Sequence, residues 1–255
     1  MKSNLRFSKD RSISVNIVFC ILCFLGLLVF SDLLQILIDL IIKNSIVSNF
    51  ISNFIFILCI YFMYFKDLNK EFKLYFKNFK NNISTSFKYY IMGFLGMVFF
   101  NIFIALFVGG ISSNEEQVRE MLFNNFIITM ISISIIAPIL EELIFRKSLE
   151  PIIKNKWVYV IVSGLLFGFA HLLTNIVSGS FTITDLVFIL PYASLGASFA
   201  LMDNETKTVF SSIVIHAIHN TCTALLLFAL YKGGLLWMKR MLKKSLINFL
   251  ILLYL

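Results

Sequence analysis

Long apolar runs dominate this sequence, and each is close to the length of a helix that crosses a bilayer. A spanning helix needs roughly 20 predominantly apolar residues. Lipid cannot hydrogen-bond the backbone, so only helices and closed barrels cross it, and the alternating pattern of barrel strands is not seen here. We therefore predict an all-α, polytopic transmembrane helical bundle of about 7–8 spans. The predicted spans are residues 15–34, 49–65, 89–110, 124–145, 157–177, 186–202 and 209–231, with the short run 245–255 as the optional eighth.

The overall composition excludes a soluble protein of this length. Of the 255 residues, 59% are hydrophobic and only 14% are charged, and the mean hydropathy is +0.88. Too few polar side chains remain to cover a surface that faces water. No repeat, soluble domain or low-complexity linker interrupts the chain, so we expect residues 1–255 to form a single membrane domain.

The positions of the basic residues predict the topology. They gather before the first apolar run and between the second and third, and such flanks normally stay in the cytoplasm. We expect a multi-pass protein of the cell membrane with a cytoplasmic N-terminus. The net charge of +8 then reflects topology and anionic lipid headgroups, and nucleic acid is not an expected partner. The basic residues are Lys2, Arg6, Lys9 and Arg11, followed by Lys66, Lys70, Lys73, Lys77, Lys80 and Lys88.

Two segments leave alternatives open. Residues 66–88 mix lysine with phenylalanine, tyrosine and leucine, which fits an amphipathic helix on the inner membrane surface or an ordinary cytoplasmic loop. The C-terminal tail conflicts with the charge pattern, because basic residues follow a span that should end outside. Part of residues 232–255 therefore re-enters or crosses the membrane, or the tail lies on its surface. The basic tail residues are Lys239, Arg240, Lys243 and Lys244.

Two adjacent glutamates, Glu141 and Glu142, end the fourth apolar run. A carboxylate within a membrane is costly and usually marks a functional site. Glu142 and Arg146 share a helix face, with the glutamate on the N-terminal side, which is the favourable order for an ion pair. Glu141 points about 100° away, so we assign it the chemistry and Glu142 the support. Pro138 cannot donate to the carbonyl of Ser134, which predicts a bare kink or a kink that opens a polar cavity.

All three histidines of the chain lie in predicted spans. Ionisable groups within membranes usually face one another, so we expect a shared polar site in the inner half to the middle of the bilayer. Phe167 lies one helical turn before His171 and would wall the pocket around its imidazole. His216 and Asn220 also share a face, and together they could donate hydrogen bonds to an oxyanion. His219, about 60° from His216 around the helix, is expected to join the site or to compete for a metal.

These residues occur in three motifs that resemble a known family. Residues 141–146 (EELIFR) resemble the EExxxR motif of the CAAX-protease and bacteriocin-processing (CPBP, or Abi) intramembrane proteases. Residues 167–171 (FGFAH) resemble the FxxxH motif of that family, and residues 216–220 (HAIHN) resemble its HxxxN motif. Each motif alone is weak, but the three occur in the order of the family. We expect residues 124–231 to form the catalytic core.

The resemblance implies a helical protease that cleaves a membrane-associated peptide or protein. Carried over, Glu141 and His171 would activate water, and His216 and Asn220 would form the oxyanion hole. The family is often described as metalloproteases, so one expectation is a divalent metal such as zinc, held by His171 and His216 with a glutamate. The other is water activation without any metal. Members cleave a C-terminal tripeptide from prenylated proteins or are linked to bacteriocin processing and self-immunity.

Other function classes compete with this interpretation. A non-catalytic bacteriocin-immunity or binding protein would use the same polar residues for packing and binding. A transporter or proton relay also uses buried Glu and His, but no inverted repeat is evident. Residues 196–198 only faintly resemble the GxSG of rhomboid serine proteases, because Phe199 stands where the second glycine is needed. No HExxH zinc motif is present.

Overall fold

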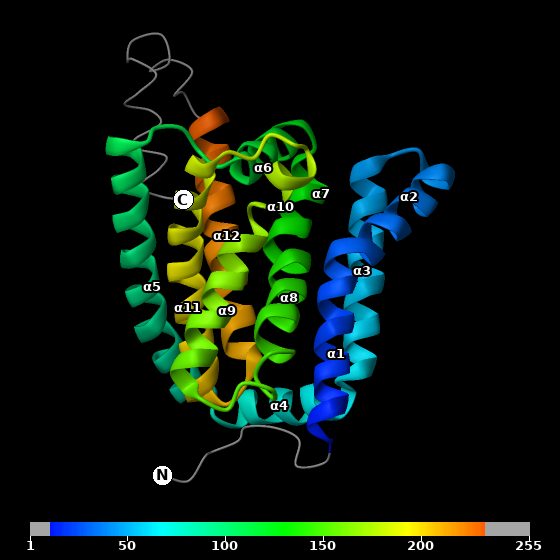
Figure 1. Cartoon of the computed structure of the whole chain (residues 1–255), viewed down its shortest axis with the longest axis vertical. Helices are drawn as coiled ribbons and strands as arrows, with labels where there is room; N and C mark the ends of the chain where they lie inside the picture. The colour runs from blue at the N-terminus through cyan, green and yellow to red at the C-terminus, as the bar shows by residue number, and fades with distance from the viewer. Residues whose placement is uncertain (1–10, 233–255) are drawn as a thin grey trace.

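The computed structural model describes residues 11–232 and contains helices but no strand in that range (Figure 1). Six helical segments are long and apolar enough to cross a membrane, so the predicted polytopic helical bundle is confirmed. The basic residues at 2–9 and the tail beyond Lys232 lie outside the described residues. In chain order the elements are α1 (Ile13–Leu25), η1 (Gly26–Phe30), α2 (Ser31–Ile42), α3 (Ser45–Met63), α4 (Phe65–Lys77), α5 (Phe79–Phe107), α6 (Ser113–Asn124), α7 (Phe126–Ile131), η2 (Ser132–Ile136), α8 (Ala137–Glu142), η3 (Leu143–Lys147), α9 (Lys156–Ala170), α10 (Leu173–Val177), η4 (Ile183–Phe188), α11 (Ile189–Thr206) and α12 (Val209–Lys232).

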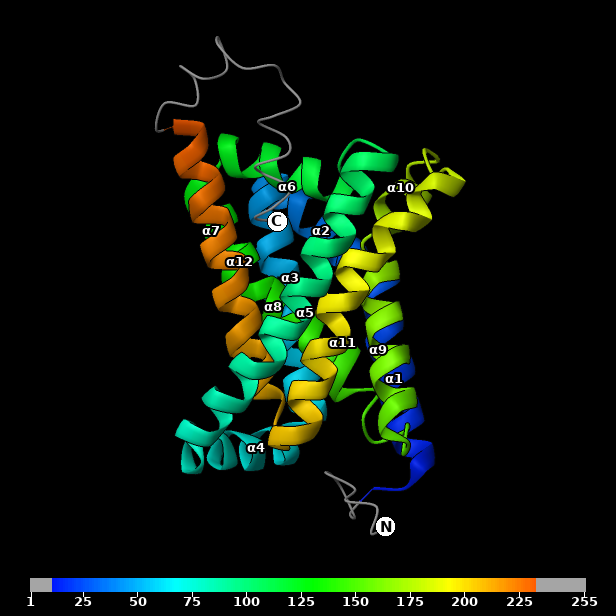
Figure 2. The same cartoon turned by 90° about the vertical axis from the view of Figure 1, so that its left-hand side faces the viewer.

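Helix α11 lies in the middle of the bundle, with α5 packed on one side of it and α9 on the other (Figure 2). The segment from α7 to η3 and helix α12 complete this central group, while α1, α2 and α3 stand to one side and contact it mainly through α3 (Figure 1). The predicted motifs fall on α8, α9 and α12, so the central group carries the candidate site.

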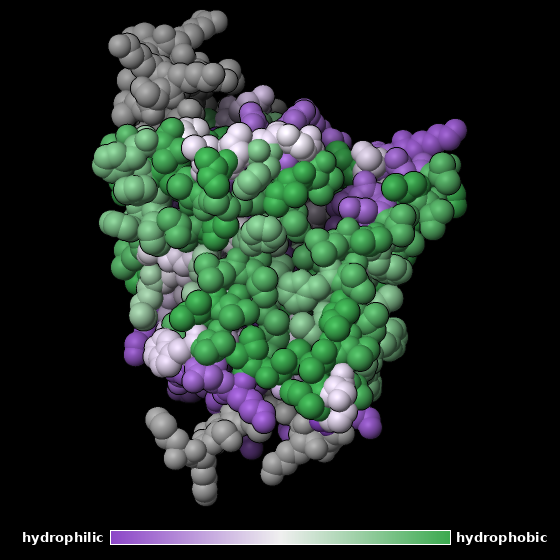
Figure 3. Space-filling view, viewed as in Figure 1, coloured by the Kyte–Doolittle hydropathy of each residue, from purple (hydrophilic) through white to green (hydrophobic). Residues whose placement is uncertain are grey.

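On the face shown in Figure 3, apolar side chains form a broad band, with polar residues gathered at its two ends. Leu40, Leu106 and Ile127 are 72%, 67% and 76% exposed, respectively. Patches of this extent are unfavourable in water, and a bilayer accommodates them. The buried core is correspondingly small and rich in serine and asparagine, for example Ser48, Ser52 and Asn82.

The fifth predicted span, residues 157–177, is wrong in its length. Helix α9 ends at Ala170, and the N–H of His171 bonds the carbonyl of Gly168 in a tight turn. A short separate helix, α10, follows. Apolar residues continue through the turn, so hydropathy gives no sign of the break. Because the helix stops there, His171 lies at a helix end rather than inside a span.

Two glycines on α9 allow this helix to pack closely against α11. A Cβ atom on Gly164 would lie 2.8 Å from the carbonyl oxygen of Ala193 on α11, and one on Gly168 would lie 2.6 Å from that of Ile189. No real Cβ atom tolerates such contacts, so both positions require glycine. The two backbones approach closely, which is the small-residue packing common between membrane helices.

Residues 65–77 form the amphipathic helix α4, so the helical alternative for this segment is confirmed and the loop is not found. The helix lies across one end of the bundle (Figure 1). Leu68, Glu71 and Tyr75 are buried on its inner face, and the lysines at 66, 70, 73 and 77 are exposed. This end is called the α4 end below, and the opposite end, which carries α6, is called the α6 end.

The boundaries of two other spans differ from those predicted. The first helical segment runs from Ile13 to Ile42, because the π-helical turn η1 redirects the chain without ending the hydrogen-bond ladder. The third begins at Phe79 rather than at residue 89. Lys80 and Lys88 near its start are exposed, and long lysine side chains can reach the membrane surface from within a helix.

Candidate active site

Glu142 is fully buried and is held by two partners. Its Oε2 lies 3.1 Å from Nε of Arg146, so the ion pair predicted from their spacing is confirmed. Its Oε1 lies 2.9 Å from Nδ1 of His216. A carboxylate can only accept, so Nδ1 of His216 carries the proton in this bond when Glu142 is ionised. Glu142 therefore fixes an imidazole on α12, a contact that helix spacing could not predict.

Arg146 is also fully buried, and its remaining surface is covered by a carbonyl and two rings. Its Nη2 donates to the carbonyl of Gly196 on α11 at 3.0 Å. The guanidinium carbon lies 4.6 Å from the ring centroid of Phe167 and 5.5 Å from that of Phe199. These cation–π contacts, together with Glu142, compensate for the loss of water around the charge. This arrangement holds α8, α9 and α11 together on the α4 side of the site.

Glu141 lines an internal cavity of about 280 Å³ and is 25% exposed. Its Oε2 lies 3.6 Å from Nε2 of His216, so this imidazole stands between the two adjacent carboxylates. Glu142 is neutralised by its cation, whereas Glu141 keeps an accessible carboxylate. The two carboxylates thus differ in their surroundings, and the division of roles between them stays a prediction.

His171 lines the same cavity at the end of α9. Its Nδ1 lies 2.8 Å from the carbonyl oxygen of Phe167, which can only accept, so Nδ1 carries a proton and Nε2 of the neutral ring is left for the cavity. The ring of Tyr192 stacks on the imidazole, with centroids 3.9 Å apart and planes 16° from parallel. Phe167 packs on both His171 and His216, as expected of a pocket wall. The histidine contact that the structure gives Glu141 is with His216.

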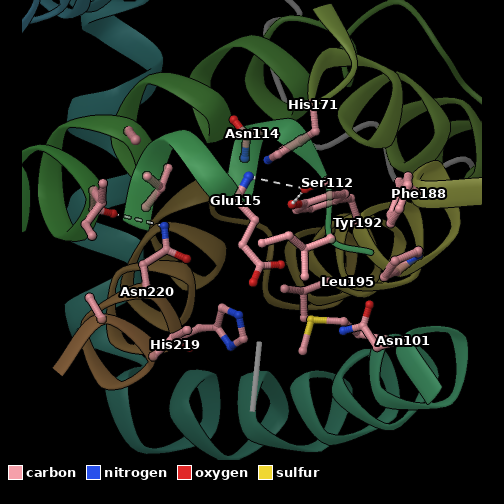
Figure 4. Close-up of a pocket in the computed structure, with 18 of the residues that line it drawn as sticks. Asn101, Ser112, Asn114, Glu115, His171, Phe188, Tyr192, Leu195, His219 and Asn220 are labelled. Carbon is pink, nitrogen blue, oxygen red and sulfur yellow. Dashed lines mark hydrogen bonds between the residues drawn. The ribbon is translucent and has the colours of Figure 1, made fainter. Parts of the chain in front are cut away.

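Asn220 lines the cavity, and its position depends on an irregularity in the facing helix. Nδ2 of Asn220 donates to the carbonyl of Ile133 at 2.9 Å (Figure 4). In the π-helical turn η2, Ala137 bonds back five residues to Ser132. Pro138, next in that register, has no N–H to give to Ile133. The carbonyl freed by Pro138 is therefore that of Ile133 rather than that of Ser134, and Asn220 takes it with one of its two N–H groups.

The α6 end of the cavity is formed by residues that lie between the predicted third and fourth spans. Ser112, the N-cap of α6, bonds the hydroxyl of Tyr192 at 2.8 Å (Figure 4). Glu115 and Arg119 pair with each other one turn apart and also line the cavity. Burial raises the pKa of the Glu115 carboxyl above its usual value, and the Arg119 guanidinium opposes that rise. The capping pattern of this segment was the one signal that could have identified the helix.

His219 also lines the cavity (Figure 4). Its Nδ1 lies 3.1 Å from the hydroxyl of Tyr90 on α5. Within residues 11–232, no three His, Cys, Asp or Glu side chains converge in a way that could hold a metal ion. The Nδ1 atoms of His171 and His216 are already engaged by Phe167 and Glu142. Nε2 of each ring is left available, and a histidine that ligates a metal commonly donates its other N–H to a carbonyl or carboxylate. The three-ligand zinc site considered from the sequence therefore stays a prediction.

Comparison with known proteins agrees with the motif resemblance. Residues 123–222 match a family model described as type II CAAX prenyl endopeptidase Rce1-like. The chain is 27% identical over 146 residues to the "Putative membrane peptidase YdiL" of Bacillus subtilis (strain 168), an alignment that covers 56% of this chain and 49% of that protein. The chain thus matches about half the length of this curated relative. No solved structure matches the chain significantly.

Proposed function

Because residues 123–222 of this chain are an Rce1-like region of the CAAX-protease (CPBP) family, we propose that the protein is an intramembrane endopeptidase. Its substrate is a membrane-associated peptide or protein, and its reaction is the hydrolysis of a peptide bond. The observation that carries the proposal is the difference between the adjacent glutamates. Glu141 presents an accessible carboxylate to a cavity shared with His171, His216 and Asn220, while Glu142 is neutralised behind it.

In the proposed reaction, Glu141 is the general base. It takes a proton from a water molecule in the cavity, and the hydroxide attacks the carbonyl carbon of the substrate. Nε2 of His171, whose Nδ1–H is engaged by Phe167, accepts a hydrogen bond from the same water and orients it. As the tetrahedral intermediate collapses, the C–N bond breaks and the proton returns from Glu141 to the leaving amine.

The oxyanion of the intermediate is assigned to Asn220 and His216. Nδ2 of Asn220 has a second N–H beyond the one given to Ile133, and that second N–H can donate. His216 is fixed through Nδ1 by Glu142 and presents Nε2 toward Glu141, so a protonated His216 provides a second donor. Removing one donor of an oxyanion hole typically lowers turnover by about 10²–10³. No step in this scheme requires a metal.

We further propose that the α4 end faces the cytoplasm, as does the N-terminus. The exposed lysines of α4 support this orientation, because basic segments that flank spans stay inside. The biological setting that the resemblance favours is bacteriocin processing or self-immunity.

The experiment is cleavage by the full-length protein in proteoliposomes, measured on a library of fluorogenic peptides. We expect cleavage by the wild type and loss of cleavage in Glu141→Gln, His171→Ala and His216→Ala. Glu116→Gln is the matched control, since Glu116 is exposed on α6 and does not line the cavity. Full activity in all three site variants would refute the assignment. Loss of activity on chelation, restored by zinc, would refute the metal-free step.

A further inference from the structure

The cavity is displaced toward one end of the bundle, and every wall shows the same displacement. On α5 the lining residues fall between positions 97 and 104, although the helix begins at Phe79. On α11 none lies beyond Leu195, and on α12 none precedes His216. These helices run in alternating directions, so each lining stretch is the part of its helix nearer the α6 end (Figure 2). The cavity therefore extends from the glutamates toward α6, beyond the depth expected from the sequence.

The α4 end of the cavity is sealed by fully buried side chains. Glu142 and Arg146 lie directly behind Glu141, and Phe199 covers the guanidinium. Beyond them, Lys147 and Glu71 pair at 2.6 Å, and neither is more than 1% exposed. None of the residues that line the cavity belongs to α4 or to the connection 148–155. A substrate entering from the α4 end would have to break both buried ion pairs.

The α6 end of the cavity is polar and partly open. Asn114 and Glu115 (Figure 4), with Val118 and Arg119, line it and keep part of their surface exposed, whereas Glu142 and Arg146 behind Glu141 are fully buried. Backbone amides of a peptide substrate need hydrogen-bonding partners, and asparagine, glutamate and arginine provide donors and acceptors at this end. The charged side chains that line the α6 end, Arg119 and Glu115, are 14% and 15% exposed, whereas those that seal the α4 end are at most 1% exposed, so the α6 end is the entrance.

The two ends differ in charge. In the described residues the α6 end carries few basic side chains and an acidic helix, while the α4 end is rich in lysine. The positive-inside rule therefore places the α6 end outside. At the α4 end are Lys66, Lys70, Lys73, Lys77, Lys80, Lys154, Lys156 and Lys207; at the α6 end are Lys43, Arg119 and Lys232, with Glu115, Glu116 and Glu120.

From this cavity direction and charge asymmetry, we propose that the site takes its substrate from the extracytoplasmic face. The substrate class is then a peptide segment on the outer side of the membrane: an exported peptide at the bilayer surface, or the outer juxtamembrane segment of a membrane protein. This proposal rests on the proposed peptidase function for its chemistry, but the side of access does not depend on that function.

The side of access is tested by cysteine labelling in intact cells. The four native cysteines are replaced, and Glu116→Cys on α6 and Lys73→Cys on α4, both exposed positions, are introduced singly. We expect a membrane-impermeant maleimide to label Glu116→Cys in intact cells and Lys73→Cys only after permeabilisation. Val118→Cys, inside the cavity, should label from the same side as Glu116→Cys. The reverse pattern, or labelling of Val118→Cys only after permeabilisation, overturns the proposal.

The substrate side is tested with two single-span reporters that carry the same cleavable peptide on opposite faces of the membrane. Cleavage of the extracytoplasmic reporter by the wild type, and not by Glu141→Gln, is the expected result. Cleavage of the cytoplasmic reporter alone overturns the proposal. If neither reporter is cut and no peptide is cleaved in proteoliposomes, the peptidase function fails, while the labelling result still decides the side of access.

Discussion

The sealed α4 end of the cavity, here called the floor, and the open cavity itself differ in the partners that their charged groups have. In the floor, Glu142 faces Arg146 and Glu71 faces Lys147, and all four side chains are almost completely buried. In the cavity, Glu141 is 25% exposed, and the contact given to its carboxylate is a histidine at 3.6 Å. The two environments meet within a single pair of adjacent residues.

A carboxylate inside a membrane protein is therefore not functional by its position alone. An ionised group removed from water must be neutralised and hydrogen-bonded, and once that is done it has little capacity left for chemistry. A group that keeps part of its surface toward a cavity can bind water and exchange a proton. The contacts around each carboxylate, rather than its depth, separate structure from catalysis.

The largest expected effect comes from Glu141→Gln. Loss of a general base typically lowers the rate by about 10²–10⁴, and we expect a loss in that range for peptide cleavage. Stability should be nearly unchanged, because no ion pair of the floor is broken. The measurements are initial cleavage rates and unfolding by SDS titration on the same preparation. A variant that kept a third of wild-type activity would remove Glu141 from the reaction.

The reverse pattern is expected for Glu142→Gln, which makes the same chemical change one residue later. It leaves the buried guanidinium of Arg146 uncompensated, and breaking one side of a buried pair costs about 3–5 kcal/mol. SDS titration should show this loss. Combining it with Arg146→Met should recover part of the stability, since no unpaired charge remains. Equal stability of Glu141→Gln and Glu142→Gln would contradict the claim that Glu142, and not Glu141, stabilises the fold.

Local spacing was enough to predict part of this site. Because i and i+4 residues meet on any helix, the Glu142–Arg146 pair followed from the sequence. The seven apolar runs likewise gave the helical fold class, since bilayer thickness sets the length of a span. Contacts between distant segments could not be obtained in this way. The bond from Glu142 to His216 joins residues that are 74 positions apart in the sequence, and no local pattern encodes it.

Irregular segments were the other source of error. The break after Ala170 occurs within a continuous apolar stretch, so hydropathy extends the helix past its true end. The carbonyl released by Pro138 is that of Ile133 because η2 is π-helical, whereas the spacing of an ordinary α-helix indicates Ser134. Helix α6 lies between two predicted spans and is not apolar, so hydropathy gave no reason to include Glu115 and Arg119 in the site.

A smaller loss of stability is expected for Glu71→Gln. Glu71 belongs to the buried ion pair that lies farther from the cavity. Glu71 accepts from Nζ of Lys147 at 2.6 Å and from the N–H of Val209, the first residue of α12, also at 2.6 Å. Hydrogen bonds to charged groups contribute about 1.5–3 kcal/mol, and Asp67, 3.9 Å from Lys147, remains as a second carboxylate. SDS titration should give a loss below that of Glu142→Gln, with exposed Lys73→Gln near zero. A larger loss of stability than that of Glu142→Gln would contradict this ranking of the two ion pairs.

The smallest effect concerns Tyr192, which connects the cavity to α6. Its ring stacks on His171 and its hydroxyl bonds Ser112. Aromatic pairs contribute about 0.5–1.5 kcal/mol, so Tyr192→Leu should lower kcat by about two- to tenfold. Tyr192→Phe keeps the stack and should retain most of kcat. Loss of the stacked ring should also shift the limb of the pH–rate profile that reports His171. We expect this shift in Tyr192→Leu and not in Tyr192→Phe. A defect in packing alone would instead lower activity equally at every pH. If Tyr192→Phe is the more damaging change, the hydroxyl bond to Ser112 governs the site instead, and α6 acts on the reaction through that bond rather than through the stacked ring.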